Sequence, residues 1–436
     1  MIQKILYSEN VLLHSPFDIY EKGFRFLYRI ERLILFKGEG TVLYTPRSEL
    51  DCRTSALQAL LAEKGIDGAL IIQSVDLFYF SGTAQNGFLY IPAIGQPVLI
   101  VRKSLARARE ESALESIVPL AGVKKLPELL SSLGYSVPET IGLEMDVIPA
   151  GNYLFYGQVF SGTRLVDISG LIRQVRQIKS EYEIELLRAS GRRMNEIYKE
   201  IPGMIREGMT EVELASKIEG MARAAGHMGY IAMRAFNQAP FFGHLMSGWT
   251  GAVPSAFDGA TGGPGLTPAF PQSGGFKPIG RGEPIVIDYV GLWDGYITDR
   301  TRFYSIGPLP DKLMKAMTTA LEIQAAIIER LKPGVNGSDL HELALDMAAA
   351  AGFGENFMGF GADQAKFIGH GVGLELDELP VLAKGLDKLL QPGMVFAVEP
   401  KFVFPGEGVV GIENTFALTE SGAEKLTSTP DGLTVI

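Results

Sequence analysis

The sequence predicts an α/β N-terminal domain followed by an α+β C-terminal domain that contains an internal duplication. In residues 1–172, short apolar runs bounded by turn residues alternate with helical patterns, as in a small α/β domain. A long amphipathic helix then begins near Ser180, and one helical segment recurs later in the chain. We therefore expect two domains, residues 1–172 and 173–436, with residues 1–45 as an extension of unassigned role.

The elements of the N-terminal domain follow from local pattern in chain order. A helical pattern covers residues 54–64 and precedes a group of short apolar runs. Two further helical stretches follow, and then two more strand-like runs. The predicted strands are 68–73, 77–82, 87–93, 97–102, 140–145 and 163–168, and the later helices are 103–115 and 123–133.

The C-terminal domain is expected to begin with a capped helix. Ser180 and Glu183 have the spacing of a capping box, in which a hydroxyl and a carboxylate each satisfy a free backbone N–H. Further along, residues 207–226 align without gaps to residues 333–352, and both segments share Gly near their opening and at their close. The alanine-rich composition of both helices explains part of this likeness, but the shared glycines favour a duplicated unit.

Composition and charge exclude several classes of protein. Hydrophobic residues make up 46% and charged residues 21%, which is typical of a globular protein, and no apolar run is long enough to span a bilayer. The start of the chain has no signal-peptide pattern. A net charge of −10 without a Lys/Arg cluster argues against nucleic acid as a partner. Cys52 is the only cysteine, so we expect no disulfide within the chain and a cytoplasmic location.

The first of two hairpin-like segments carries two aspartates. Asp294–Gly295 is a strong two-residue turn signal, and this turn would pair Asp288 with Thr301 and Asp299 with Val290. Asp288 and Val290 are two residues apart on one strand and point to the same face. Asp288 and Asp299 should therefore be diagonal neighbours on that face.

The second hairpin-like segment carries two glutamates. A loop over residues 405–407 would place Glu399 directly opposite Glu413. Like charges opposite one another destabilise a sheet, and a buried carboxylate without a partner is costly. Acids that point into solvent are the alternative, but two pairs in matching places of a duplicated unit favour a bound positive charge.

His370, in the segment FIGHGVGLELDELP, is the fifth candidate ligand. A lone His beside Gly is by itself more often structural than a ligand. Together with four carboxylates, however, one imidazole forms an oxygen-rich set suited to a pair of divalent ions such as Mn²⁺, Co²⁺ or Fe²⁺. Two such ions can share a bridging water, lower its pKa and stabilise an oxyanion.

These segments resemble a known family, the Xaa-Pro aminopeptidases, prolidases, methionine aminopeptidases and creatinases. LFYFSGTAQNGFLYIPAIGQPVLIV (77–101) resembles the creatinase-type N-terminal domain, and LIRQVRQIKSEYEIELLR (171–188) resembles the entry into the catalytic domain. Four later blocks match the metal-ligand blocks of the family in order: IDYVGLWDGYITDRTR (287–302), GHGVGLELDELP (369–380), VFAVEP (395–400) and VVGIENT (409–415).

The resemblance implies a fold, a ligand set and a reaction. The fold is a creatinase-like N-terminal domain followed by a pita-bread catalytic domain. The metal would be two divalent ions of Mn, Co, Fe or Zn, and the protein a homodimer that cleaves small peptides after the N-terminal residue, usually before proline. The implied metal ligands are Asp288, Asp299, His370, Glu399 and Glu413.

Three positions depart from the family pattern. Gln272 stands about where the peptidases have the His of an LPHG-like block, and Asp377 replaces the His of GLEVHE-like blocks. Gly411 occupies the place of an Arg that often precedes the last Glu by two residues. Gln cannot protonate a leaving amine, and an ionised Asp accepts hydrogen bonds rather than donating them. Either another group moves the proton or the reaction differs from proline-peptide hydrolysis.

His244 is the candidate replacement for the missing histidines. It lies in the Gly- and aromatic-rich segment 241–275, which is longer than an ordinary connection and therefore more often functional. A packed or solvated loop histidine is the equally weighted alternative.

Three functions are compatible with these residues. The first is a metal-dependent hydrolase of a peptide or small amide, in which Glu399 or a neighbouring acid accepts the proton of the attacking water. The second is a non-peptidase enzyme on the same scaffold, a lyase or small-amidine hydrolase, with Asp377 as a base and the 241–275 segment building a new pocket. The third is a binding protein without catalysis, which the complete ligand set argues against.

Overall fold

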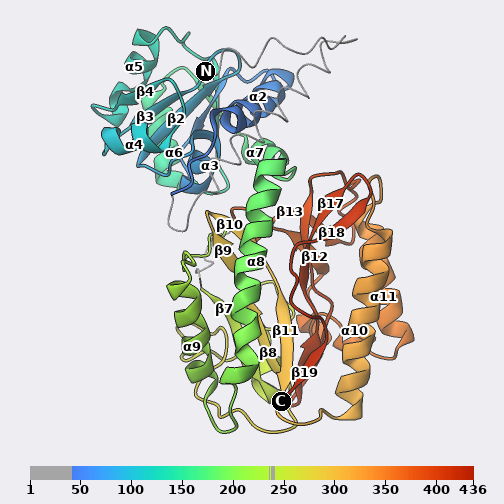
Figure 1. Ribbon diagram of the computed structural model, residues 1–436. Helices are drawn as coiled ribbons and strands as arrows, with labels where there is room; N and C mark the ends of the chain where they lie inside the picture. The colour runs from blue at the N-terminus through green and yellow to red at the C-terminus, as the bar shows by residue number, and fades with distance from the viewer. Residues whose placement is uncertain (1–41, 235, 237–240) are drawn as a thin grey trace, which may run out of the picture. The chain divides into compact units, whose positions relative to one another are not determined.

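A computed structural model describes residues 42–234, 236 and 241–436 of the chain (Figure 1). Except for its last four residues, the unassigned extension 1–45 therefore lies outside the described residues. Within the described part of the chain, no helix is long and apolar enough to cross a membrane.

The N-terminal half is built on one mixed six-stranded sheet in the order β4-β3-β2-β1-β5-β6. All four residues of its central strand β1 (Gly68–Ile71) are buried, as expected for a strand that is covered on both faces. The other strands are β2 (Gly87–Pro92), β3 (Val98–Val101), β4 (Ile117–Pro119), β5 (Thr140–Leu143) and β6 (Arg164–Asp167). The helices are α2 (Arg47–Glu63), α3 (Ser74–Ser81), α4 (Leu105–Glu111), η2 (Val123–Lys125), α5 (Leu126–Ser132), α6 (Ala150–Val159) and α7 (Ser169–Arg176).

The strand predicted over residues 77–82 is wrong, because this segment forms the helix α3. The side chain of Gln73 accepts a hydrogen bond from the backbone N–H of Asp76 at 2.7 Å and caps the helix start. Gly82, at φ +76°, ends the helix in the left-handed conformation that glycine adopts most readily. A short apolar run is compatible with a buried strand or a buried helix, and periodicity alone does not separate the two.

The C-terminal half contains the predicted duplication. Helix α8 (Glu181–Met204) begins at the predicted capping box. The helices of the repeat, α9 (Glu211–Ala224) and α11 (Gly337–Ala350), start and end at equivalent positions of the two aligned segments. Together with α10 (Asp311–Arg330) they form two helix pairs, α8–α9 and α10–α11, that flank the strands of this half in Figure 1.

The strands between these helix pairs form two larger sheets and two short ribbons. The sheet orders are β19-β11-β8-β7 and β13-β12-β14-β17-β18, and the ribbons are β10-β9 and β15-β16. The strands of the first half are β7 (Gly243–Ser247), β8 (Ile285–Tyr289), β9 (Gly291–Trp293), β10 (Tyr296–Thr298) and β11 (Thr301–Ser305). Those of the second half are β12 (Phe367–Gly371), β13 (Glu378–Ala383), β14 (Val395–Val398), β15 (Lys401–Phe404), β16 (Gly408–Gly411), β17 (Asn414–Thr419), β18 (Gly422–Lys425) and β19 (Leu433–Val435). Short 3-10 turns are η3 (Gly248–Ala252), η4 (Gly354–Asn356) and η5 (Gly361–Asp363).

Both predicted hairpin registers are confirmed. Asp288 pairs with Thr301, and the turn between β9 and β10 has positive φ at Asp294 and Gly295, as a type I′ turn requires. In the second hairpin, Lys401 at the start of β15 pairs with Gly411 at the end of β16. Asp299, Glu399 and Glu413 therefore lie just beyond the ends of ribbons whose registers are set by local turns, and Asp288 lies in β8.

A buried ionic cluster joins helix α7 to later parts of the chain. The Arg176 side chain is 3% exposed and its guanidinium contacts three carboxylates. The three partners are Asp76 at 2.7 Å, Glu375 at 2.8 Å and Glu378 at 2.5 Å. Such a cluster fixes the position of strand β13, which begins at Glu378, because each buried charge needs its partners.

Candidate metal centre

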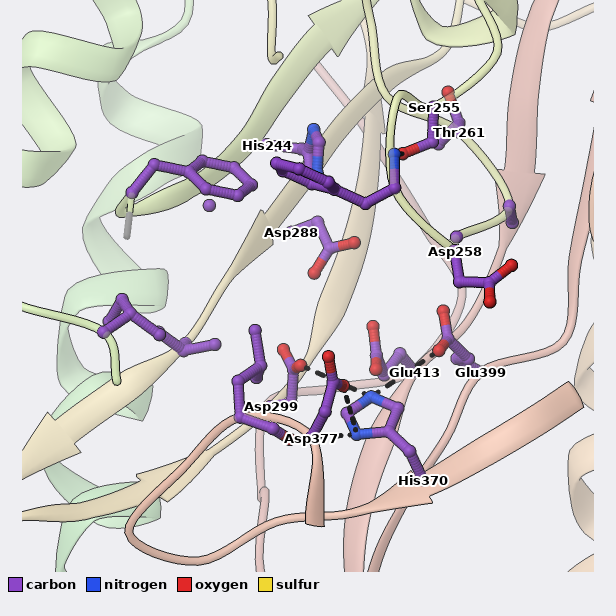
Figure 2. A pocket seen from close by; sticks show the side chains of 18 of the residues that line it. His244, Ser255, Asp258, Thr261, Asp288, Asp299, His370, Asp377, Glu399 and Glu413 are labelled. Carbon is purple, nitrogen blue, oxygen red and sulfur yellow. Dashed lines mark hydrogen bonds and ion pairs between the residues drawn. The ribbon is translucent and has the colours of Figure 1, made fainter. Parts of the chain in front are cut away.

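The five predicted ligands converge on one pocket with about 820 Å³ of empty space. They come from strands β8 and β12 and from the ends of the two short ribbons. Figure 2 shows Asp299, His370, Glu399 and Glu413 gathered on one side of the pocket, with Asp288 between them and His244. The structure therefore brings together all the residues that the sequence proposed as ligands.

His370 is held so that one ring nitrogen faces the carboxylates. Its Nδ1 lies 3.0 Å from the carbonyl oxygen of Leu376, and because a carbonyl only accepts, this nitrogen carries the proton. Its Nε2 lies 3.6 Å from Glu399 Oε1 and 3.9 Å from Asp299 Oδ2. A carbonyl on one nitrogen and acidic oxygens around the other is the arrangement found around metal-bound histidines.

The carboxylates lack enough positive partners among the described residues. Burial, reinforced by Glu413 and Asp288, raises the pKa of Asp299 well above its usual range. Burial also raises the pKa of Glu413 to about 8, although Lys401 acts in the opposite direction. Asp299 Oδ1 is buried and has no hydrogen-bond partner in the described part of the chain. These are the signs of a site that a further cation would stabilise.

The donor set fits a divalent ion. Asp299, His370 and Glu413 each offer a ligand atom, and these atoms lie within 4.8 Å of one another. The unpartnered Asp299 oxygen and Nε2 of His370, which faces acidic oxygens, are then both accounted for by metal coordination.

Lys401 is a member of the site that sequence reasoning missed. Its side chain is 3% exposed, and its Nζ lies 2.7 Å from Glu399 Oε2 and 3.0 Å from both Asp288 Oδ2 and Glu413 Oε2. Burial alone would lower the pKa of Lys401, but the three carboxylates raise it well above its usual value. The signal was present in the sequence: Lys401 follows Glu399 by two residues in a strand-like segment, a spacing that predicts a shared face.

His244 reaches the same pocket from β7. It pairs with Asp288 across the sheet, lines the pocket, and packs edge-on against Phe241. Burial lowers the pKa of His244, with Lys401 acting in the same direction and Asp288 against it, so the imidazole is neutral near pH 7. Its buried Nδ1 has no partner among the described residues. The position agrees with the predicted role beside the substrate, which stays a prediction.

Asp377 lies beside the Nδ1 side of the His370 ring and also lines the pocket. Its Oδ1 is 3.3 Å from Nδ1 of His370, the nitrogen that points away from the other carboxylates, and its side chain is half exposed. Figure 2 shows this carboxylate beside the ring. The geometry suits a residue that orients the imidazole, whereas the sequence suggested a base.

Gln272 does not stand beside the ligands as expected. It is 2% exposed, lies outside the pocket lining, and neither side-chain polar atom has a partner within the described residues. Ser255 lines the pocket instead, followed by Asp258 and Thr261. Spacing along the long and irregular 241–275 segment therefore does not bring Gln272 to the pocket.

Comparisons with known proteins match nearly the whole described chain. Residues 185–420 match the description "Metallopeptidase family M24", and residues 53–178 match "Creatinase/Prolidase N-terminal domain".

Relatives and solved structures agree with these two matches. The chain is 29% identical to an Xaa-Pro dipeptidase from Pyrococcus furiosus, over 86% of this chain and 98% of the relative. It is 26% identical to an uncharacterized peptidase, YqhT, from Bacillus subtilis, over 87% of this chain and 99% of the relative. The structure of an Xaa-Pro dipeptidase from Bacillus anthracis superposes with a TM-score of 0.77 at 26% identity, covering 89% of this chain and all of that one.

Proposed function

We propose that this chain, which belongs to metallopeptidase family M24 and has a creatinase/prolidase N-terminal domain, is a metal-dependent hydrolase of the Xaa-Pro dipeptidase type. The family and the relatives make it a metallopeptidase-type hydrolase. That it acts on a peptide or small amide bond, at a centre formed by Asp288, Asp299, His370, Glu399 and Glu413, is our proposal.

The orientation of His370 is the observation that carries the proposal. With Nδ1 donating to a carbonyl, Nε2 is the ring nitrogen left to face a space bordered by Asp299 and Glu399. A divalent ion at this position, Mn²⁺, Co²⁺, Fe²⁺ or Zn²⁺, would lower the pKa of a water and stabilise the oxyanion that develops on the substrate. The family resemblance implies two ions. Our proposal does not depend on how many ions bind, because Lys401 already contacts three of the four carboxylates.

The remaining roles follow from what each side chain contacts. Lys401 holds Oε2 of Glu399, which leaves Oε1 as the atom that can accept the proton of the attacking water. His244, buried and neutral on the opposite wall, is placed to hydrogen-bond the substrate. Asp377 orients the His370 ring through Nδ1.

The test is hydrolysis of a panel of Xaa-Pro dipeptides by protein loaded with Mn²⁺ or Co²⁺. We expect release of the N-terminal residue, its loss on chelation and its return on adding metal. His370→Ala should abolish turnover and metal binding, whereas His341→Ala, a buried histidine of α11 outside the pocket, should retain both. Metal-loaded protein that cleaves no member of a wide panel would refute the peptidase assignment.

A small-amidine hydrolase is the second candidate, and the pocket wall favours it. Asp258 and Asp377 line the pocket with the rings of Phe241, Phe242 and Phe367, and no arginine is among the described lining residues. Carboxylates and aromatic faces both favour a cationic substrate. The carboxylate of a dipeptide, in contrast, would find no arginine among these lining residues to pair with. Turnover of cationic amidines in preference to dipeptides, lost in Asp258→Asn, would establish this reading. Equal turnover by Asp258→Asn would exclude it.

A homodimer and a cytoplasmic location stay expectations. The mass in solution, measured by light scattering, tests the first.

A further inference from the structure

The side chain of Lys401 places an ammonium among the buried carboxylates of the candidate metal centre. Lys401 is the first residue of β15, two residues after Glu399, and its ammonium reaches Glu399 Oε2, Asp288 Oδ2 and Glu413 Oε2 at 2.7, 3.0 and 3.0 Å. These three carboxylates come from three different segments of the chain. The ammonium therefore joins the two hairpins at their carboxylates.

Gly411, directly across the strand pair, makes this position of Lys401 possible. A Cβ at residue 411 would lie 3.0 Å from Cγ of Lys401 and 2.5 Å from the carbonyl oxygen of Pro400. Any larger side chain at 411 would displace the lysine or the strand. Glycine at position 411, where members of the family often have Arg, therefore leaves the space that the Lys401 side chain occupies.

The carboxylate oxygens divide between two cation positions. On one side, His370 Nε2 faces Oε1 of Glu399 and Oδ2 of Asp299, and the other oxygen of Asp299 has no partner among the described residues. On the other side, Lys401 takes Oε2 of Glu399 and one oxygen each of Asp288 and Glu413. The first position offers an imidazole and free acceptors, and the second is filled by an ammonium.

We propose that the ammonium of Lys401 replaces the second divalent ion, so that the chain binds one ion, held by Asp299, His370, Glu399 and Glu413. The inference rests on the proposed function in assuming that these ligands bind a metal. A divalent ion sits roughly 2.0–2.2 Å from carboxylate oxygens. The oxygens of Asp288 and Glu413 that would hold a second ion already carry hydrogen bonds from Nζ, and two cations cannot occupy the same place.

A one-ion site changes what each residue does. Asp288 becomes a partner of Lys401 rather than a metal ligand. The ammonium fixes the orientation of Glu399 through Oε2 and leaves Oε1 free for the metal side. The positive charge at the second cation position then belongs to the Lys401 side chain, so it does not exchange with ions in solution.

Metal counting tests the proposal. Protein stripped with a chelator, reloaded with excess Mn²⁺ and freed of unbound metal should hold about one ion per chain. Lys401→Gly should hold about two, because the space and the oxygens at Asp288 become available. Lys401→Arg, which keeps a cation, should hold about one, as should Lys332→Gly at an exposed position on the surface.

Electron paramagnetic resonance of the Mn²⁺-loaded wild type gives a readout that needs no variant. One isolated Mn²⁺ gives an uncoupled six-line spectrum, whereas two ions that share ligands give an exchange-coupled one. A coupled spectrum and two ions per chain in the wild type would overturn the proposal while leaving the proposed hydrolase intact. One ion in Lys401→Gly would equally overturn it. A wild type that binds no ion at all would instead refute the proposed function.

Discussion

Replacing Asp377 with Asn separates an orienting role from a role in proton transfer. The substitution keeps the shape of the side chain and removes its charge, while Nδ1 of His370 keeps its hydrogen bond to the carbonyl of Leu376. Groups that orient metal-bound histidines typically contribute 10- to 100-fold in metal affinity. The Asp377 side chain is half exposed, and the carbonyl of Leu376 also orients the ring. We therefore expect a loss of metal affinity at the lower end of this range, about tenfold or ~1.4 kcal/mol.

The assay is competition for Mn²⁺ against a chromogenic chelator, with kcat and KM then measured at saturating metal. We expect weaker metal binding by Asp377→Asn and a kcat within about twofold of the wild type once metal saturates. The matched control is Asp363→Asn, an exposed aspartate of η5, which should change neither quantity. Unchanged metal affinity with a large fall in kcat would refute the orienting role and restore Asp377 as a base.

Three further predictions concern stability. Arg176→Met should destabilise the fold by about 3 kcal/mol in urea unfolding, because it removes the guanidinium shared by three buried carboxylates, although Asp76 keeps Arg234 and Glu378 keeps Lys179; a loss below about 1 kcal/mol would contradict this. His227 is buried, accepts from the N–H of Gly229 and faces the carbonyl of Val290, and burial lowers its pKa from 6.5 to about 4. The unfolded chain therefore binds a proton at this histidine below pH 6.5, whereas the folded protein binds it only near pH 4. The free energy of unfolding should fall by up to about 3 kcal/mol as the pH drops from 6.5 towards 4, and His227→Gln should lose this dependence. Ser180→Ala removes the capping-box hydroxyl and should cost about 1 kcal/mol, whereas Ser180→Thr should recover most of it.

The elements of the site that could be predicted are those set by local geometry. A two-residue turn at Asp294–Gly295 fixes the register of its hairpin, and the strand period of two then fixes which residues share a face. The capping box at Ser180 and the paired glycines of the duplicated helices are equally local. These features depend on neighbours in sequence, so pattern alone was sufficient.

The elements that could not be predicted depend on distant packing. Helix α3 is a short buried apolar run, and the period of such a run does not decide between a strand and a helix, so packing against the rest of the domain decides. The course of the 241–275 segment is decided by what it packs against, which is why Gln272 lies outside the pocket and Ser255 lines it. Sequence spacing in an irregular segment does not define a position in space.

The charge of the site shows a different limit of sequence reasoning. Four clustered acids require a positive partner, but electrostatics alone does not say whether that partner is an ion from solution or a side chain of the protein. The identity is decided by the other atoms at each position. Next to His370, an imidazole nitrogen stands among carboxylate oxygens, a mixed set of donors typical of a divalent metal site. Next to Asp288, the oxygens that face Lys401 all belong to carboxylates, and there a lysine is sufficient.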